Sequence, residues 1–154
     1  GIVLKNLRPK KLSGDKVPSI DVVKYEVAKY SKKYKIIILL QPTSPLRKSI
    51  EIDKAISLLF KKKLQSLVSI TNYKFKPKFQ ILKNKHNKIK KLYFNETKKI
   101  SNYGLNGSIY LFTLSYLNKK NQLFGIGSNC FETHYSTSID VDEMKDIKEV
   151  IKYI

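Results

Sequence analysis

Three short segments of the chain carry side chains that could bind or activate a ligand. The first, residues 41–47 (QPTSPLR), offers an amide, two hydroxyls and a guanidinium on a loop that two prolines stiffen. It directly follows Ile36 to Leu40, an unbroken run of Ile and Leu that predicts a buried strand. Ligands of open α/β sheets bind beyond the carboxyl ends of the strands. The spacing alone fits either a binding loop or a structural turn.

The second segment, residues 138–142 (SIDVD), places two acids two positions apart in a chain with only 12 acidic residues. Alternate residues of an extended segment share a face. Asp140 and Asp142 are therefore candidates to hold a hard cation through oxygen ligands. The alternative is that Asp142 caps a terminal helix, and both roles can coexist.

The third segment, residues 106–110 (NGSIY), combines a glycine with two polar side chains. Gly107 permits a close approach to the backbone, and Asn106 and Tyr110 add hydrogen-bonding groups. The alternative is an ordinary entry from a loop into a strand.

Helical and strand-like patterns alternate along the chain and must position these segments. Apolar periodicity predicts helices over 18–30, 48–62, 114–117 and 143–154, and strands over 34–40, 66–71, 107–112 and 135–139, with a strand tail at 1–4. Residues 73–100 are Lys-rich with short alternating runs, which predicts antiparallel hairpins projecting from the main sheet. Residues 1–154 therefore read as one α/β domain with a mostly parallel sheet.

Composition excludes several classes of protein. At 154 residues and 42% hydrophobic residues, the chain is long and apolar enough to fold as a domain. It has no apolar run of about 18 residues, so no membrane span is predicted. The single cysteine, Cys130, excludes an internal disulfide framework and a cysteine zinc cluster, and it fits a reducing cytoplasm.

The net charge of +19 raises the possibility of a basic α/β module that binds nucleic acid or another polyanion. However, 29 of the 31 basic residues are lysines, whereas proteins that read base edges rely on arginine. The lysines are spread along the chain beside 18 Ile and 10 Asn, which an AT-rich genome would also produce. We therefore do not favour nucleic acid as a partner, although the polyanion-binding module stays open as an alternative.

The strings LLQPTSPLR at 39–47, NGSIY at 106–110 and IDVD at 139–142 together closely resemble the acylneuraminate cytidylyltransferases. Residues 7–9 (LRP) and 12–15 (LSGD) resemble the stretch before that family's second conserved helix. The order and approximate spacing of the motifs also fit. The resemblance implies an α/β fold of three layers, of the nucleotide-diphospho-sugar transferase type.

The resemblance also implies a reaction, in which the anomeric hydroxyl of a 2-keto-3-deoxy sugar acid attacks the α-phosphate of CTP with Mg²⁺ and releases pyrophosphate. By similarity, two residues lie at the cytidine, three contact the sugar acid and two hold Mg²⁺. In the same order, these are Arg8 and Ser19; Gln41, Asn106 and Tyr110; and Asp140 and Asp142. The resemblance assigns the catalytic role to Gln41, Asp140 and Asp142.

Residues 73–100 resemble the family's dimerisation arm, which implies a homodimer in which Lys76 or Lys78 touches the partner's sugar site. The family begins with a glycine-rich, basic loop that has no counterpart here. We therefore expect an N-terminally truncated, C-terminal part of such an enzyme, inactive alone. An Arg-rich stretch of the sialic-acid enzymes is replaced by residues 95–99 (NETKK). That leaves the substrate open among N-acetylneuraminic, legionaminic, pseudaminic and related nonulosonic acids.

Overall fold

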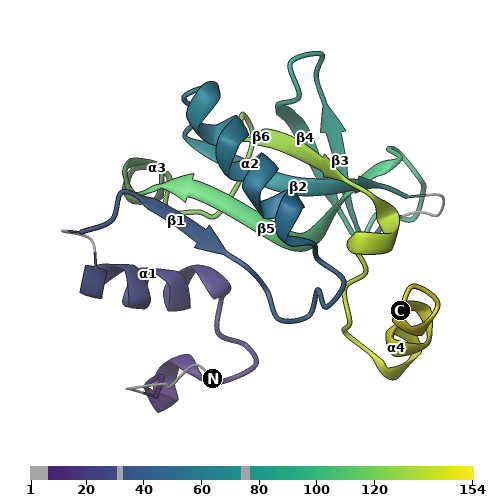
Figure 1. Cartoon of the computed structure of the whole chain (residues 1–154), viewed down its shortest axis with the longest axis horizontal. Helices are drawn as coiled ribbons and strands as arrows, with labels where there is room; N and C mark the ends of the chain where they lie inside the picture. The colour runs from purple at the N-terminus through teal and green to yellow at the C-terminus, as the bar shows by residue number, and fades with distance from the viewer. Residues whose placement is uncertain (1–6, 31–32, 74–76) are drawn as a thin grey trace.

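The computed structural model describes residues 7–30, 33–73 and 77–154. The predicted strand tail at 1–4 and Lys76 lie outside the described residues. Figure 1 shows a sheet flanked by helices. In chain order the elements are η1 (Lys10–Leu12), α1 (Ser19–Tyr30), β1 (Ile36–Leu39), α2 (Ser49–Lys61), β2 (Ser66–Asn72), β3 (Phe79–Lys83), β4 (Ile89–Phe94), β5 (Tyr103–Thr113), α3 (Leu114–Lys120), β6 (Asn129–Thr133), η2 (Tyr135–Thr137) and α4 (Met144–Ile151).

The strands form one mixed sheet in the order β4-β3-β5-β2-β6, and β1 pairs with β5 beside this path. β5 runs antiparallel to β1, β2 and β3, and β3 runs antiparallel to β4, whereas β2 and β6 are parallel. The prediction of a mostly parallel sheet is therefore wrong for the described strands. The strand–helix–strand order β1-α2-β2 suggested adjacent parallel strands, but the long β5 lies between them.

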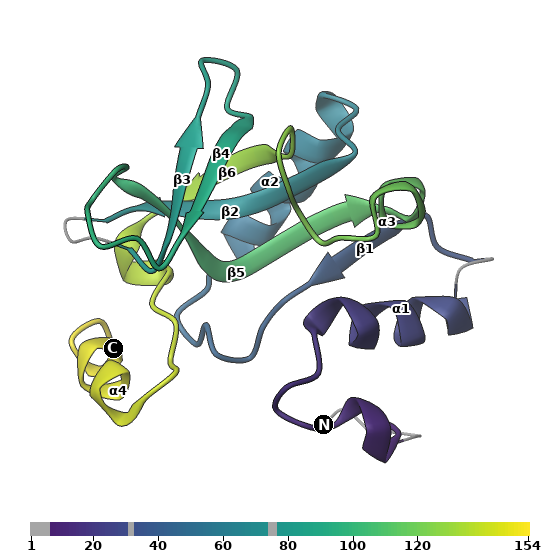
Figure 2. The ribbon, with the colours of Figure 1, turned by 180° about the vertical axis from the view of Figure 1, so that it is seen from behind.

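Helices cover both faces of this sheet. Alternate residues of β5 face opposite sides, so Ile109 and Leu111 pack in a core cluster with α2. Tyr110 and Phe112 belong to the cluster on the other face, to which α1 contributes Val23. Figure 2, seen from behind, shows α2 on the far side of the sheet and α1 below β1. None of the helices among the described residues is long and apolar enough to cross a membrane.

Most predicted elements are confirmed within a few residues, but the strand predicted at 135–139 is wrong. The strand at this place, β6, ends at Thr133, and a turn of 3-10 helix, η2, follows it. His134 Nδ1 accepts a hydrogen bond from the Ser136 amide, and the hydroxyls of Thr137 and Ser138 donate to the His134 carbonyl. Such local bonds from Ser, Thr and His side chains compete with a strand ladder.

β1 also differs from the buried strand that the Ile36 to Leu40 run predicts, which would be covered on both faces. It is antiparallel to β5 and, among the described residues, has no second partner strand. Ile37 and Leu39 pack on the core cluster to which α1 contributes, whereas Ile38 is 38% exposed. Ile36 alone packs on the cluster of the α2 face among the β1 residues. A short apolar run thus fits an edge strand as well as a central strand.

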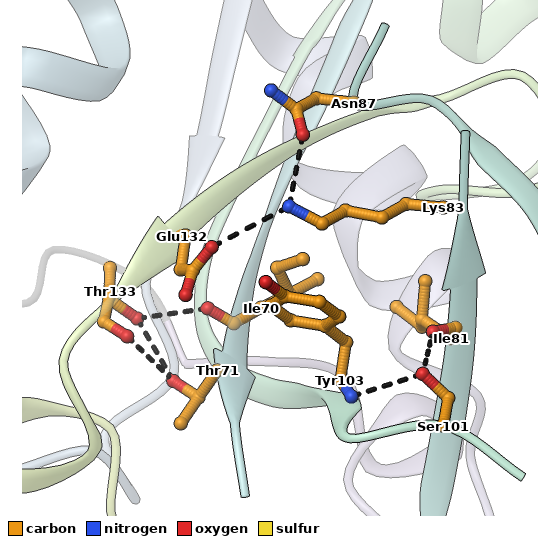
Figure 3. Close-up of polar contacts among 9 residues, drawn as sticks. All are labelled: Ile70, Thr71, Ile81, Lys83, Asn87, Ser101, Tyr103, Glu132 and Thr133. Atoms are coloured by element: carbon orange, nitrogen blue, oxygen red, sulfur yellow. Dashed lines mark hydrogen bonds and ion pairs between the residues drawn. The ribbon is translucent and has the colours of Figure 1, made fainter. Parts of the chain in front are cut away.

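β3 and β4 form an antiparallel hairpin within residues 73–100. Ile81 and Ile89 of this hairpin are buried in the core cluster that they share with Val68 of β2 and Tyr110 of β5. Lys83 Nζ lies 3.5 Å from a carboxylate oxygen of Glu132 on β6 and 4.2 Å from the ring centre of Tyr103, as Figure 3 shows. These contacts anchor the hairpin to its own sheet. Its role as a dimerisation arm stays a prediction.

Candidate functional site

The three segments that the sequence singled out meet at one place in the fold. The Val141 amide donates to the Thr43 carbonyl at 2.8 Å, which joins the 41–47 loop to the 138–142 segment. Both approach Gly107 on β5. A Cβ atom added there would lie 2.6 Å from Gln41 Oε1 and 3.3 Å from Asp140 Oδ2. The structure therefore brings Gln41 and Asp140 together over a residue that must lack a side chain.

β5 carries a bulge at this point. β2 pairs Val68 with Tyr110 but Ile70 with Leu105, so β5 has extra residues between the two pairs. Gly107 lies within the bulge at φ +71°, a left-handed conformation that glycine adopts readily. Bulges beside active sites redirect side chains that a regular strand would point elsewhere.

Side chains replace the ladder hydrogen bonds that the bulge removes. Ser69 Oγ accepts from the Ile109 amide at 2.8 Å and donates to Asn106 Oδ1 at 2.6 Å. The same Asn106 oxygen accepts from the Ser108 amide at 3.1 Å. The bulge is therefore fixed by a buried polar network on the β2 side of β5.

Asn106 lies at the centre of this network and is only 2% exposed. Its amide nitrogen donates to Thr71 Oγ1 at 2.9 Å and to Thr133 Oγ1 at 2.7 Å. Figure 3 shows Thr71 and Thr133 facing one another from β2 and β6. Every hydrogen bond of the Asn106 side chain is made with another group of the protein, so Asn106 supports the bulge. Its predicted contact with a sugar remains a prediction.

Sequence reasoning missed the hydroxyl groups of Ser69, Thr71 and Thr133. A signal was present in the segment 66–71, where Ser69 and Thr71 lie two positions apart among apolar residues. Alternate residues of a strand share a face. Two hydroxyls on one face of a buried strand need buried partners, and Asn106 is that partner.

Asp140 has an unusual electrostatic environment. Burial raises the pKa of its carboxyl above the ordinary value, and the charges of Asp142 and Asp146 raise it further. A hydrogen bond with Thr43 and the cation of Lys78 act in the opposite direction on this pKa. Lys78, predicted as one of two lysines that reach a partner's site, is therefore near Asp140 of its own chain.

Asp142, the second predicted metal ligand, is exposed beside the start of α4. The N-cap of α4 is Glu143, so the interpretation of Asp142 as the cap is wrong. Instead the amides of Asp142 and Glu143 both donate to Asp146 Oδ2, at 3.0 and 2.8 Å. The Asp142 carboxylate thus carries no capping bond. Within the described ranges, no group of three or more His, Cys, Asp or Glu residues is placed to hold a metal ion.

Tyr110 borders the same site from β5. It is 8% exposed, and burial, together with the charge of Asp140, raises its pKa to about 12. Burial and the same carboxylate also raise the pKa of Tyr73. Both phenols therefore remain protonated at neutral pH and able to donate hydrogen bonds.

Three buried polar atoms at this site have no hydrogen-bond partner: Ser44 Oγ, Ser108 Oγ and Asp140 Oδ1. Each comes from a different one of the three segments. Buried polar atoms are nearly always paired in folded proteins, and an unpaired one calls for an explanation such as an absent ligand, ion or water. Among the described residues, the buried side-chain atoms without a partner therefore all belong to these three segments.

The two residues predicted at the cytidine lie elsewhere. Arg8 is exposed and its Nη1 donates to the Leu12 carbonyl at 3.4 Å. Ser19 is the exposed first residue of α1. Within the described residues no recorded contact joins either one to Gln41 or Asp140, so their predicted roles stay predictions.

No family model matches the chain. Among curated proteins, it is 30% identical over 152 residues to an N-acylneuraminate cytidylyltransferase of Escherichia coli O18:K1:H7 (strain RS218 / NMEC), covering 94% of the chain and 36% of that protein. It is 26% identical over 147 residues to a post-translational flagellin modification protein B of Campylobacter coli, covering 90% of the chain and 63% of that protein. The chain thus spans less than two thirds of either relative.

Among solved structures, the fold is similar to that of a nucleoside-diphosphate-sugar pyrophosphorylase from Vibrio cholerae. The TM-score is 0.55 at 11% identity, over 86% of this chain and 64% of that one. The similarity shows a shared mixed α/β fold, which in the described part of this chain combines the sheet with four α-helices. The sequence comparison agrees with the resemblance that the motifs at 39–47, 106–110 and 139–142 predicted: the chain is similar to an N-acylneuraminate cytidylyltransferase.

Proposed function

We propose that the site around Gln41, Gly107 and Asp140 belongs to a nucleotidyltransferase of sugar-nucleotide synthesis. More finely, it belongs to a cytidylyltransferase that moves CMP from CTP to a nonulosonic acid. The observation that carries the proposal is that the three motif segments meet at Gly107 and that each of them holds a buried polar atom without a partner. The name of the Escherichia coli relative supports the class of reaction, and the structural neighbour supports the fold.

Mg²⁺ fits the acidic side of this site. Asp140 Oδ1 is buried without a partner, and the nearby Asp142 carboxylate is exposed and carries no capping bond. Protein Mg²⁺ sites commonly use one or two carboxylates and complete the shell with water and substrate phosphates. Asp140 and Asp142 would hold the ion, which when bound neutralises charge that develops on the transferring phosphate.

The remaining residues have roles in binding and orientation. Gln41 presents its side-chain amide over the bulge, where it can hydrogen-bond the sugar acid and direct its anomeric hydroxyl toward the α-phosphorus. The new oxygen–phosphorus bond forms as the bond to pyrophosphate breaks, pyrophosphate leaves with the electron pair, and the proton of the hydroxyl passes to solvent. Tyr110 supplies a protonated phenol at the sugar, and Asn106 shapes the sugar pocket by holding the bulge of β5. Arg8 and Ser19 bind the cytidine, and the 73–100 arm joins two subunits.

The test uses CTP, Mg²⁺ and N-acetylneuraminate with the chain and with two variants, Asp142→Asn and Asp53→Asn. Asp53 is an exposed acid on α2 and serves as the matched control. Pyrophosphate release is measured together with Mg²⁺-dependent binding of CTP by calorimetry, which does not require turnover. We expect Asp142→Asn to lose Mg²⁺-dependent binding and Asp53→Asn to retain it.

Two outcomes would overturn the proposal. One is Mg²⁺-dependent CTP binding that Asp142→Asn leaves unchanged. The other is a chain that binds single-stranded RNA or DNA but neither CTP nor a nonulosonic acid, which would favour the polyanion-binding module instead.

A further inference from the structure

Arg47 occupies the point at which β1 and β5 separate. The register pairs Leu39 with Tyr110, so two more residues of ladder would set Gln41 opposite Ser108. The ladder stops before that. Instead Arg47 Nη1 donates to both main-chain carbonyls, to Gln41 at 3.0 Å and to Ser108 at 2.7 Å. One guanidinium nitrogen thus takes the place of the missing strand pair.

The environment of Arg47 shows that its charge is not neutralised by an acid. Among the described residues, no carboxylate oxygen lies within 4.0 Å of the Arg47 guanidinium, so Arg47 forms no ion pair there. Burial alone lowers its pKa from the ordinary value. Partial burial of a cation costs free energy that only hydrogen bonds offset here. Only two of the 31 basic residues are arginines, and one of the two is placed here despite this cost.

The loop that carries Arg47 also closes on itself. The Arg47 amide donates to the Ser44 carbonyl, and the Ser44 amide donates to the Gln41 carbonyl, each at 3.4 Å. The main chain of Gln41 is therefore held from within the loop and by the guanidinium. On the opposite edge of β5, Ser69 and Asn106 hold the same bulge. The place where Gln41 meets Gly107 is fixed from both edges of the strand.

We propose that Arg47 is a positioning residue, whose guanidinium holds the ends of β1 and β5 apart at a fixed separation and sets the Gln41 amide over Gly107. For its consequence in binding a sugar acid, this inference rests on the proposed function. Arg47 acts through Gln41 and need not touch a substrate.

The experiment compares Arg47→Met, Arg47→Lys and the control Lys54→Met, which removes an exposed lysine of α2. Circular dichroism melting reports the overall fold. Amide NMR resonances of Gly107 and Ser108, and the side-chain amide of Gln41, report the local geometry without any ligand. Titration with N-acetylneuraminate in the presence of CTP and Mg²⁺ then reports the sugar site.

In Arg47→Met we expect a cooperative melt, shifted resonances at Gly107, Ser108 and the Gln41 side chain, and affinity for N-acetylneuraminate lower by about tenfold. Arg47→Lys should recover part of both signals because an ammonium can donate to two carbonyls. Lys54→Met should match the wild type. Should Arg47→Met fail to fold, the lysine variant decides: shifted resonances in it support the positioning role, and unchanged resonances in it count against that role.

Unchanged local resonances in both Arg47 variants would overturn the positioning role, whatever the ligand data show. Shifted resonances in a chain that binds no nonulosonic acid would support the positioning role and count against the proposed function. Shifted resonances with undiminished affinity for N-acetylneuraminate would overturn the link between Arg47 and the sugar site.

Discussion

Replacing Gly107 by alanine tests the site most directly, because two separate penalties can be read from the structure. The residue lies at φ +71°, where a side chain costs roughly 1–2 kcal/mol. In a chain of this length that corresponds to a melting temperature lower by about 2–8 °C. In addition, the new methyl group would lie 2.6 Å from Gln41 Oε1. Ordinary van der Waals contact begins at 3.4 Å, so the Gln41 amide must move.

The displacement required of Gln41 Oε1 is about 0.8 Å, the shortfall from ordinary contact. The end of a glutamine side chain moves at little cost in stability, but misplacement of a positioning group by about 1 Å can cost on the order of 100-fold in rate. We therefore expect Gly107→Ala to fold, to lose only the backbone penalty in stability, and to bind N-acetylneuraminate about 10- to 100-fold more weakly in the presence of CTP and Mg²⁺.

Gly127 supplies a matched control. It has a similar left-handed backbone, φ +87°, but an added Cβ there meets no atom within 4 Å. Gly127→Ala should therefore show a similar loss of melting temperature without a loss of ligand affinity. Equal losses of affinity in the two variants, or full affinity in Gly107→Ala, would refute the reasoning that the amide over Gly107 is part of the site.

Two further predictions concern the buried polar groups. Asn106→Ala removes the centre of the network and leaves the hydroxyls of Thr71 and Thr133 without their amide donor; it should cost about 3 kcal/mol and lower the melting temperature by about 6–12 °C, whereas Asn102→Ala on an exposed loop should change it little. Asp140→Asn should raise the melting temperature at pH 7. Because burial raises the pKa of Asp140 in the folded chain, folding favours its protonated form, and the ionised form destabilises the fold as the pH rises from the ordinary aspartate pKa through the raised one. Melting curves from pH 3 to pH 8 should show the gain vanish at the acid end; a destabilised variant at pH 7 would contradict this assignment.

Periodicity predicted the helices well because α1 and α2 each bury one stripe of apolar residues. It could not predict the order of the strands. β1 and β2 read as consecutive strands of a parallel sheet, and only long-range pairing shows that β5 separates them. The strand predicted at 135–139 failed for a local reason, since hydrogen bonds to His134 turn the backbone there.

The candidate site was predictable in part. Gln41, Asp140 and Gly107 stood out by residue type, and the fold brings them together. The supporting residues were harder to find, because Ser69 and Arg47 act through hydrogen bonds to residues about 40 and 60 positions away. A bulge has no sequence signal of its own apart from its glycine. Its two supports can be recognised only when strand register is known.

The charge of the chain acquires a more specific meaning beside this site. The chain as a whole carries +19, yet Asp140, Asp142 and Asp146 lie close enough together to raise the pKa of Asp140. A reaction on a triphosphate requires both signs of charge, because acids must hold the metal ion while cations attract the phosphates. Under the proposed function, the spread of lysines raises the local concentration of anionic substrates through the field of the whole protein. Asp140 and Asp142 would then hold the divalent cation with its phosphates, and the charge of Asp146 adds to the negative potential there. Under the proposed function, the lysine bias therefore favours the approach of anionic substrates, whereas the 140–146 segment needs the opposite sign of charge to hold the metal ion.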